Sequence, residues 1–423
     1  MNADISMYIN REIACSCGKV HFCPITDVVV RSGALEELAQ RTEAYRKIFV
    51  VADGNTWAVC GETVWNALAG RVSGRLIYER EGVLVPDEPA MAELSGALPE
   101  EADFVLGVGS GVINDLCKYV SFKRGLECGI VATAPSMDGY ASSGAAMIVG
   151  GMKVTYTMHP PKLIVADVDV VKNAPMDMIR AGYGDIIGKY SSLNDWRLSN
   201  LMTGEYFCPE IHDLVLAVTD DIRDSVKAII GREEEAIAKL MRALILIGVT
   251  LSLVGSTRPG SGSEHHLSHF FEIVGLTRSE PYFVHGTDVA YSTIVTAGMR
   301  EKIAAMEKPV FRAEAKEARE AAWQRIYGPV AGEVVALQQE AGCYERNLRP
   351  AYAEKWDEIR ALMAECPTAE ACGKMFEDAG YRLADFEKLY GREKIHDAEL
   401  YGKDLKNRYS VLWLYYELFS GEA

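Results

Sequence analysis

One stretch of the chain decides the expected fold, and it reads Asp103-Phe-Val-Leu-Gly-Val-Gly-Ser-Gly-Val-Ile-Asn-Asp-Leu-Cys-Lys118. An apolar run ends in a glycine turn, and a helical pattern follows, as where a strand passes into a helix in a parallel α/β sheet. Glycines let backbone amides approach a pyrophosphate, and a helix N-terminus favours its negative charge. Val112 fills the third glycine position of Gly-x-Gly-x-x-Gly, so a turn without a ligand is the competing interpretation.

Further apolar runs lie on both sides of this stretch. They cover residues 47–52, 75–78, 129–133 and 163–167, and a helical segment at about 57–69 separates the first two. Apolar strands that alternate with helices predict a parallel sheet with helices on both faces. We therefore expect an α/β, Rossmann-like domain over residues 1–175, with ligands at the carboxyl ends of its strands.

After residue 175 the pattern becomes helical. Apolar residues recur at three- and four-residue spacing over 233–255, whereas 299–326 and 351–364 are charged and alanine-rich, as surface helices are. The segment 409–419 is apolar on nearly all sides and is expected to be buried. With 423 residues the chain is too long for one ordinary core. We expect an all-α C-terminal domain over residues 176–423.

Composition narrows the classes of function. The chain is 49% hydrophobic and 25% charged, which is typical of a globular protein, and its net charge of −16 argues against a nucleic-acid partner. The sequence contains no run of eighteen apolar residues, and its first residues lack a basic region followed by an apolar one. These features predict a cytoplasmic protein without a membrane span.

The ten cysteines are scattered along the chain, which favours free thiols over a disulfide framework. One cluster stands apart and contains Cys15, Cys17, His21 and Cys23. Its spacing is not that of a common zinc module, and one short hairpin rarely supplies four ligands. The sequence therefore leaves the role of this cluster open and does not favour a structural metal there.

Half of the eight histidines fall between residues 265 and 285. His265 and His269 are four residues apart, so on a helix they share a face, whereas His266 points about 100° away and is expected to be structural. His285 precedes a glycine, and Asp185 is expected in the first turns of a helix that follows residues 181–184. One carboxylate and two imidazoles would supply three metal ligands and leave room for a substrate. Helix capping by Asp185 and a surface pair of histidines are the competing interpretations.

A segment with small hydroxyl residues follows the run at 129–133. It reads Thr133-Ala-Pro-Ser136-Met-Asp138-Gly-Tyr-Ala-Ser142. Hydroxyl groups at the carboxyl end of a strand can bind phosphate or ribose, and Asp138 can bind a substrate hydroxyl. A turn stabilised by these side chains explains the segment equally well.

Taken in order, the motifs resemble those of the iron-containing alcohol dehydrogenase and dehydroquinate synthase superfamily. Within it, the chain is most similar to the bacterial type of sn-glycerol-1-phosphate dehydrogenase. The motifs are Gly-Ser-Gly-Val-Ile-Asn-Asp at 109–115, the 133–142 segment, Ala-Gly-x-Gly-Asp at 181–185, Asp195-Trp196, Ser-Gly-Ser-Glu-His-x-x-Ser-His at 261–269 and His-Gly at 285–286. The resemblance implies a dehydroquinate synthase-like fold and covers roughly residues 45 to 300. The segment beyond residue 300 receives no chemical role.

The resemblance also implies roles for individual residues. Asp185, His265 and His285 would bind one divalent metal, with zinc and nickel as the first candidates and iron as a third. With His269 they would form the catalytic set, and His269, Asp138 and Asp185 would contact substrate. NAD or NADP would be bound by Gly109, Ser110, Gly111, Val112, Ile113, Asn114, Asp115, Thr133, Ala134, Pro135, Ser136 and Ser142.

The implied reaction is the reversible reduction of dihydroxyacetone phosphate to sn-glycerol 1-phosphate, in which the metal polarises the C2 oxygen and NAD(P)H carries the hydride. Lys153, Lys189 and Arg258 are unranked candidates for binding the substrate phosphate. Asp53 would favour NAD by accepting a bond from a ribose hydroxyl, although turn capping explains it as well. A homodimer is expected by resemblance.

Three other functions remain open at this point. The first is a glycerol dehydrogenase that acts on an unphosphorylated polyol, and the second is a dehydroquinate synthase-like cyclase that uses NAD without net redox. The third alternative is a catalytically silent relative that binds NAD and serves as a regulatory protein. An intact set of metal ligands argues against the third.

Overall fold

The computed structural model describes residues 4–80 and 82–421, and the chain forms two compact units. Unit 1 comprises the residues up to 149 together with 153–186 and 213–257. Unit 2 comprises residues 150–152, 187–212 and those from 258 onward. The domain division at residue 175 stays a prediction.

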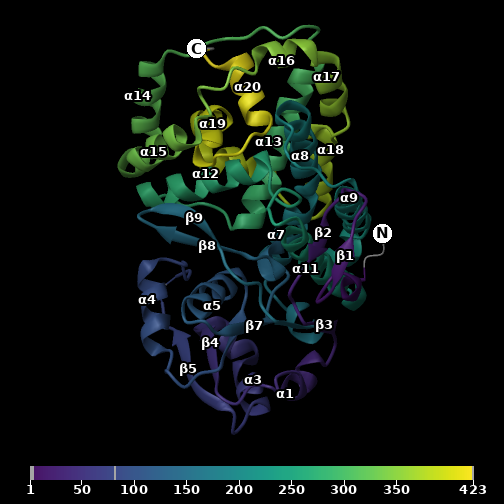
Figure 1. Ribbon diagram of the computed structural model, residues 1–423, viewed down its shortest axis with the longest axis vertical. Helices are drawn as coiled ribbons and strands as arrows, with labels where there is room; N and C mark the ends of the chain where they lie inside the picture. Colours follow the sequence, from purple (N-terminus) through teal and green to yellow (C-terminus); the bar gives the residue numbers. More distant parts are fainter. Residues whose placement is uncertain (1–3, 81, 422–423) are drawn as a thin grey trace. The chain divides into compact units, whose positions relative to one another are not determined.

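Unit 1 is built around a six-stranded parallel sheet (Figure 1). In spatial order its strands are β3 (Asp27–Arg31), β10 (Leu163–Asp167), β7 (Glu127–Ala132), β6 (Phe104–Gly109), β4 (Ile48–Asp53) and β5 (Val72–Tyr78). The middle strands β4, β6, β7 and β10 are almost wholly buried, because helices cover both faces of a parallel sheet. All five apolar runs of the sequence analysis are strands, so the prediction of a parallel α/β sheet is confirmed.

Helices lie between consecutive strands from β3 to β7. They are α1 (Leu38–Arg41), α2 (Gly54–Thr56), α3 (Glu62–Ala67), α4 (Glu88–Ala97) and α5 (Gly111–Lys123), and α6 (Val168–Val171) follows β10. The helical segment expected at 57–69 begins three residues earlier, at Gly54, because Asp53 forms a capping box with Thr56. A single π-helical turn, Trp57–Gly61, joins α2 to α3.

A long apolar helix, α11 (Glu234–Val254), lies inside unit 1 and contacts the 3-10 turn η4 (Asp138–Ala141). By length and composition α11 would be able to cross a membrane, yet 83% of its most apolar window is buried within the structure. It is a core helix, as the periodic apolar pattern over 233–255 predicted. Parts of α7 (Met176–Ile187) and α9 (Pro209–Asp224), and all of α10 (Val226–Ile230), also belong to this unit.

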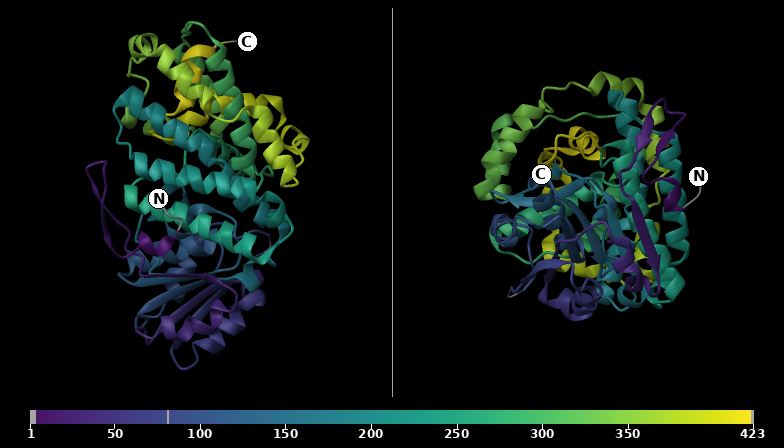
Figure 2. Two further views of the ribbon diagram at one scale, coloured as in Figure 1. Left: turned by 90° about the vertical axis from the view of Figure 1, so that its right-hand side faces the viewer. Right: turned by 60° about the horizontal axis from the view of Figure 1, so that its bottom comes forward.

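Two antiparallel hairpins lie outside the parallel sheet. One pairs β8 (Gly144–Val149) with β9 (Met152–Thr157). The other pairs β1 (Glu12–Ala14) with β2 (Val20–Phe22), and in Figure 2 it projects as a purple ribbon away from the sheet of unit 1.

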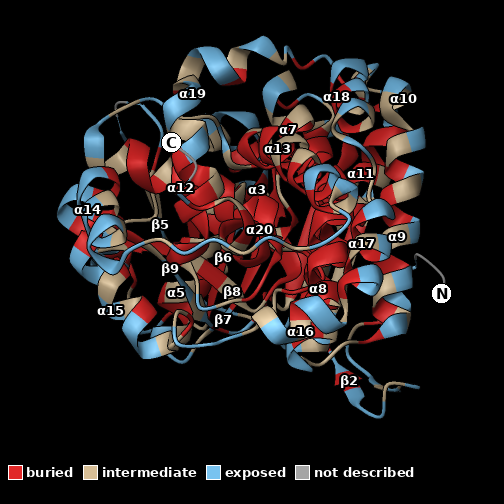
Figure 3. Cartoon of the chain, turned by 90° about the horizontal axis from the view of Figure 1, so that it is seen from above, coloured by how far each residue is buried: buried red, intermediate tan, exposed pale blue. Residues whose placement is uncertain are grey.

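Unit 2 is helical, which confirms the expected helical C-terminal region. Its helices are α8 (Lys189–Thr203), α12 (Ser263–Arg278), α13 (His285–Ala305), α14 (Lys316–Tyr327), α15 (Ala331–Ala341), α16 (Arg349–Glu354), α17 (Trp356–Ala364), α18 (Ala369–Asp378), α19 (Ala384–Tyr401) and α20 (Val411–Phe419). Figure 3 shows α13 and α20 mostly buried, and α14 and α15 with broad exposed faces.

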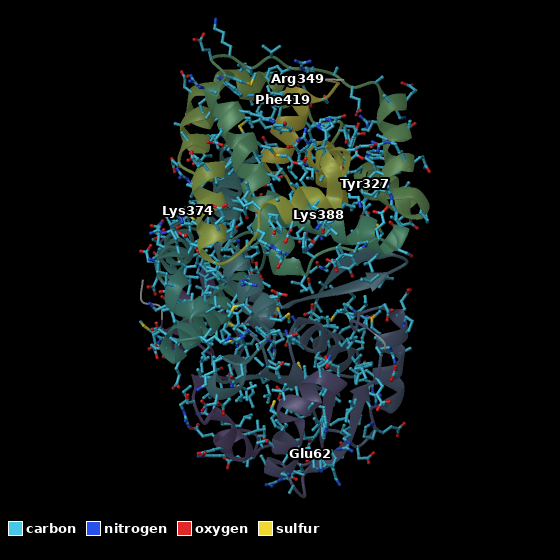
Figure 4. All side chains as sticks on the ribbon, turned by 180° about the vertical axis from the view of Figure 1, so that it is seen from behind. Glu62, Tyr327, Arg349, Lys374, Lys388 and Phe419 are labelled. Atoms are coloured by element: carbon cyan, nitrogen blue, oxygen red, sulfur yellow. The ribbon has the colours of Figure 1, made fainter. Side chains whose placement is uncertain are left out.

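The C-terminal segment packs into unit 2. Helix α20 is buried along almost its whole length, as expected from its apolar sequence. Figure 4 labels Arg349 and, on α20, Phe419. The Arg349 guanidinium donates to Glu417 of α20 at 2.6 Å. Tyr327, also labelled there, donates its hydroxyl to the Tyr401 carbonyl at 2.6 Å. These contacts make the segment beyond residue 300 part of the helical core.

Candidate active site

The glycine turn lies at the carboxyl end of the sheet in unit 1. Strand β6 ends at Gly109 and helix α5 begins at Gly111, and the amide of Thr133, just after β7, donates to the Gly109 carbonyl at 3.0 Å. Ser110 is the N-cap residue of α5, but its side chain makes no capping hydrogen bond. The first-turn amides of this thirteen-residue helix therefore suit an anion such as a pyrophosphate.

Two polar residues of the turn bind neighbouring backbone. The Asn114 amide donates to the Gly139 carbonyl at 3.3 Å. The Asp115 carboxylate accepts from the Ala146 amide at 3.1 Å and pairs with Lys118 at 2.8 Å. In this structure both residues fix the segment after β7, so they act by positioning that segment.

The structure brings the 133–142 segment together with Asp185. Tyr140 donates to the Ala134 carbonyl at 2.7 Å, and Ser142 donates to the Gly139 carbonyl at 3.1 Å, which folds the segment into a compact turn. The amide of Asp138 donates to the Asp185 carboxylate at 3.0 Å. Both carboxylates are buried in unit 1, at the same end of the sheet as the glycine turn.

The predicted position of Asp185 in its helix is wrong. Asp185 lies in the last turn of α7, which begins at Met176 and continues through residues 181–184. A Cβ atom on Gly182 would lie 1.9 Å from the Pro135 carbonyl oxygen. The glycine thus lets α7 pack directly against the 133–142 segment. This tertiary contact, not helix termination, explains why a glycine stands at position 182.

Three imidazoles gather in unit 2. His265 and His269 lie on α12, and His285 is the first residue of α13. The ring centre of His265 is 5.1 Å from that of His285, and His269 is 5.6 Å from His285. One ring nitrogen of His265 and one of His285 lie within 4.8 Å of each other, which suits two ligands of one metal ion.

Hydrogen bonds orient these two rings. The Nδ1 atom of His265 lies 2.7 Å from the Glu264 carboxylate, and the Nδ1 atom of His285 lies 3.3 Å from the Ser268 hydroxyl. When Nδ1 is held in this way, Nε2 becomes the metal-binding atom. Burial alone would raise the pKa of Glu264, but hydrogen bonds from His265 and the Gly262 amide hold that pKa below its ordinary value. Glu264 therefore stays ionised and fixes the His265 ring.

The N-terminus of α12 is anchored by Asp195. Its carboxylate accepts from the Ser263 amide at 2.6 Å and from the Val411 amide at 2.8 Å, and Arg300 balances its charge at 3.0 Å. A Cβ atom on Gly262 would lie 2.6 Å from the Asp195 carboxylate, so this close contact requires glycine. The Ser-Gly-Ser-Glu-His motif thus positions His265.

The chain is similar to known proteins in sequence and in fold. The family model of iron-containing alcohol dehydrogenases matches residues 29–175. A glycerol-1-phosphate dehydrogenase [NAD(P)+] of Bacillus licheniformis is 31% identical, over 82% of this chain and 93% of the relative. That of Geobacillus thermodenitrificans is 30% identical, over 91% and 90%. This chain belongs to the glycerol-1-phosphate dehydrogenase family.

A solved structure shares the fold. Sulfoacetaldehyde reductase from Bifidobacterium kashiwanohense, crystallised with NAD+, superposes with a TM-score of 0.61 at 14% identity, over 95% of this chain and 98% of that one. The glycerol-1-phosphate dehydrogenase family thus places this chain among oxidoreductases built on the iron-containing alcohol dehydrogenase fold.

His266 is buried within unit 2. Burial holds its pKa well below the ordinary value, and the positive charges of Arg408 and Lys406 act in the same direction. A neutral, fully buried imidazole next to His265 agrees with its expected structural role.

The candidate cations differ in their surroundings. Arg258 is buried and paired with Glu205 at 2.7 Å, and Lys189 is buried and donates to the Gly260 carbonyl at 2.8 Å. Lys153 lies half-buried on β9. Sequence analysis missed Arg408, which donates to the Ser261 carbonyl at 3.0 Å. Burial, reinforced by Arg258, lowers the pKa of Arg408 to about 10.

Sequence analysis also assigned no role to Glu264 or to the anchoring bonds of Asp195. Glu264 lies next to His265 within the quoted motif, so the sequence contained the signal from which a carboxylate that orients His265 could have been predicted. The partners of Asp195 are distant in sequence, and no local signal pointed to them.

Proposed function

We propose that this protein catalyses the NAD(P)H-dependent, reversible reduction of dihydroxyacetone phosphate to sn-glycerol 1-phosphate. The observation that carries the proposal is the pair of imidazoles, His265 and His285, each with its Nδ1 atom held by a neighbouring group. Relatives that match most of the chain are named glycerol-1-phosphate dehydrogenase [NAD(P)+], and their name supports the substrate.

Asp185, His265 and His285 would bind the metal. A carboxylate and two imidazoles suit zinc, nickel and ferrous iron, and Glu264 behind His265 is the carboxylate partner that metal-binding histidines commonly have. When bound, the metal supplies a Lewis acid for the C2 oxygen and the nicotinamide supplies the hydride.

The nucleotide would bind at the carboxyl end of the sheet in unit 1. The Ser110 and Gly111 amides at the start of α5 would contact the pyrophosphate, and Thr133 to Ser136 and Ser142 would line the same end. Asp53 caps α2 by accepting from the Thr56 amide at 2.9 Å, so its carboxylate already has a structural role. The choice between NAD and NADP is left to the assay below.

Protein groups would handle the proton and the substrate hydroxyls. His269 lies beside His285 and would relay the proton to or from the C2 oxygen, because an imidazole titrates near neutral pH. Asp138 and Asp185 would accept hydrogen bonds from substrate hydroxyls.

A cation would meet the substrate phosphate. Arg258 is paired with Glu205, and Lys153, Lys189 and the newly found Arg408 are the other candidates. Burial lowers the pKa of Arg408 to about 10, the charge of Arg258 acts in the same direction, and a phosphate bound beside Arg408 would favour its charged form. We also propose that the protein is cytoplasmic and forms a homodimer.

The test is oxidation of NADH and of NADPH by protein stripped of metal and reloaded with zinc, nickel or iron(II). Dihydroxyacetone phosphate and dihydroxyacetone would be compared as substrates. Metal-dependent turnover of the phosphate alone is the expected result. Equal use of dihydroxyacetone would instead identify a glycerol dehydrogenase, and no turnover of either would favour the cyclase or the silent relative.

A further inference from the structure

The N-terminal hairpin is short. Strands β1 and β2 are three residues each, and their residues alternate between exposed and half-buried except at one buried position. Figure 2 shows the hairpin standing off the six-stranded sheet, and Figure 3 colours most of it exposed. A two-stranded hairpin of this size is marginal in water by itself, so another interaction is needed to fix it.

Metal-binding groups gather at the turn of this hairpin. One ligand atom each from Cys15, Cys17 and His21 lies within 4.8 Å of the others. The Cys17 thiol is 3.4 Å from Nε2 of His21. The turn is tight, because the Cys15 amide and carbonyl bond to Lys19 and Gly18 at 3.1 Å, and this brings both thiols to one end of the hairpin.

His21 is oriented as a metal ligand. Its ring is buried, and its Nδ1 atom lies 2.7 Å from the Leu253 carbonyl oxygen of α11, in the same unit. A histidine that donates from Nδ1 to a backbone carbonyl presents the lone pair of Nε2, and Nε2 is the atom that faces Cys17.

Cys23 is fully buried just past the end of β2, and it is not among the residues whose ligand atoms gather within 4.8 Å of one another.

We propose that Cys15, Cys17 and His21 bind a zinc ion within unit 1, at a site separate from the proposed catalytic metal. Two thiolates and one imidazole are ligands of the kind that zinc prefers. The ion would close the turn of the hairpin and, through His21 and the Leu253 carbonyl, hold the hairpin against α11. This inference does not depend on the proposed reaction.

Cobalt substitution distinguishes this site from the catalytic one. Protein produced with cobalt(II) should show sulfur-to-cobalt charge-transfer absorption, because the Asp185, His265 and His285 set contains no sulfur. We expect Cys15→Ser and Cys17→Ser to lose this absorption and to lose one equivalent of bound metal. Cys23→Ala, a matched buried thiol of the same segment, and His265→Ala should both keep it.

Each contrary result overturns part of the assignment. Retained absorption in Cys17→Ser would overturn the site, and retained absorption in Cys15→Ser would overturn the assignment of Cys15 as a ligand. If a variant fails to fold, a measurement on the unaltered protein still tests the site. An organomercurial that reacts with thiolates should release one equivalent of zinc to a chromogenic chelator, and release of none would also overturn the site.

Discussion

At the scale of single residues, unit 2 keeps a guanidinium in its interior. Arg258 is 2% exposed, and its charge is met by Glu205, which also accepts from the Ser199 hydroxyl at 2.5 Å. Burial alone would raise the pKa of Glu205, but the bonds from Arg258 and Ser199 outweigh it and lower that pKa below its ordinary value. A buried charge that loses its partner is costly, so the pair is a sensitive point of the unit.

We expect Glu205→Gln to lower the free energy of unfolding by about 2–3 kcal/mol at neutral pH, less than for a fully buried pair because Glu205 is partly exposed. A carboxylate whose pKa is lower in the folded state stabilises above its unfolded pKa, roughly pH 4, and the effect disappears as the pH falls through its folded value. The difference between wild type and variant in urea denaturation should therefore shrink below about pH 4. Glu365→Gln, which breaks the exposed pair with Arg197, is the control and should cost less than about 1 kcal/mol. An equal loss in both variants would contradict the argument.

Residue chemistry was predictable only where the signal was local. His265 and His269 share a helix face because they are four residues apart, and the structure places both on α12. Asp195 appeared in the sequence only as part of a family motif. Its role comes from the Ser263 and Val411 amides, which are 68 and 216 residues away. No short-range pattern contains such a bond.

At the scale of elements, strands were easier to predict than helix ends. Four buried strands and the edge strand β5 were predicted from apolar runs, whereas the other edge strand, β3, was not, because its run of three valines is flanked by Asp27 and Arg31. The glycines before Asp185 suggested that a helix starts after them, but α7 runs through them. The contact between Pro135 and Gly182 explains why a glycine lies within α7, and a sequence alone does not show that contact.

Gly182→Ala should therefore disturb α7 as an element. The added Cβ would lie 1.9 Å from the Pro135 carbonyl oxygen, so the helix must move away from the segment that contains Asp138. We expect a loss of about 1–3 kcal/mol in unfolding free energy, and more if backbone movement is resisted. Gly96→Ala in α4 is the matched control, because nothing lies within 4 Å of its added Cβ. It should stabilise by up to about 1 kcal/mol in thermal denaturation. A stabilised Gly182→Ala variant would refute the close contact.

At the scale of the whole molecule, each unit contributes a separate part of the proposed chemistry. The glycine turn, the 133–142 segment and Asp185 belong to unit 1, whereas His265, His269 and His285 belong to unit 2. The fold class of each unit followed from hydrophobic periodicity. The burial of 409–419 also followed from its apolar sequence, but the polar contacts of this region, such as that between Trp323 and Asp404 at 2.8 Å, did not.

This division predicts that nucleotide binding and metal binding can be lost independently. Ser110→Asp should leave folding intact, since aspartate is a good N-cap residue, but it places a negative charge where the pyrophosphate would bind. We expect NADH affinity, measured by fluorescence titration, to fall at least about tenfold, equivalent to roughly 1.4 kcal/mol, with metal content unchanged.

His265→Ala should show the opposite pattern, with metal content and activity lost and NADH affinity kept. His266→Ala is its matched control: it removes a neighbouring buried imidazole and should retain the metal at some cost in stability. If His266→Ala loses the metal and His265→Ala keeps it, the assignment along α12 is displaced by one residue. If Ser110→Asp binds NADH like the wild type, the nucleotide does not use the start of α5. Because each variant acts on residues of one unit, a simultaneous loss of both ligands would mean that metal and nucleotide bind as a coupled set.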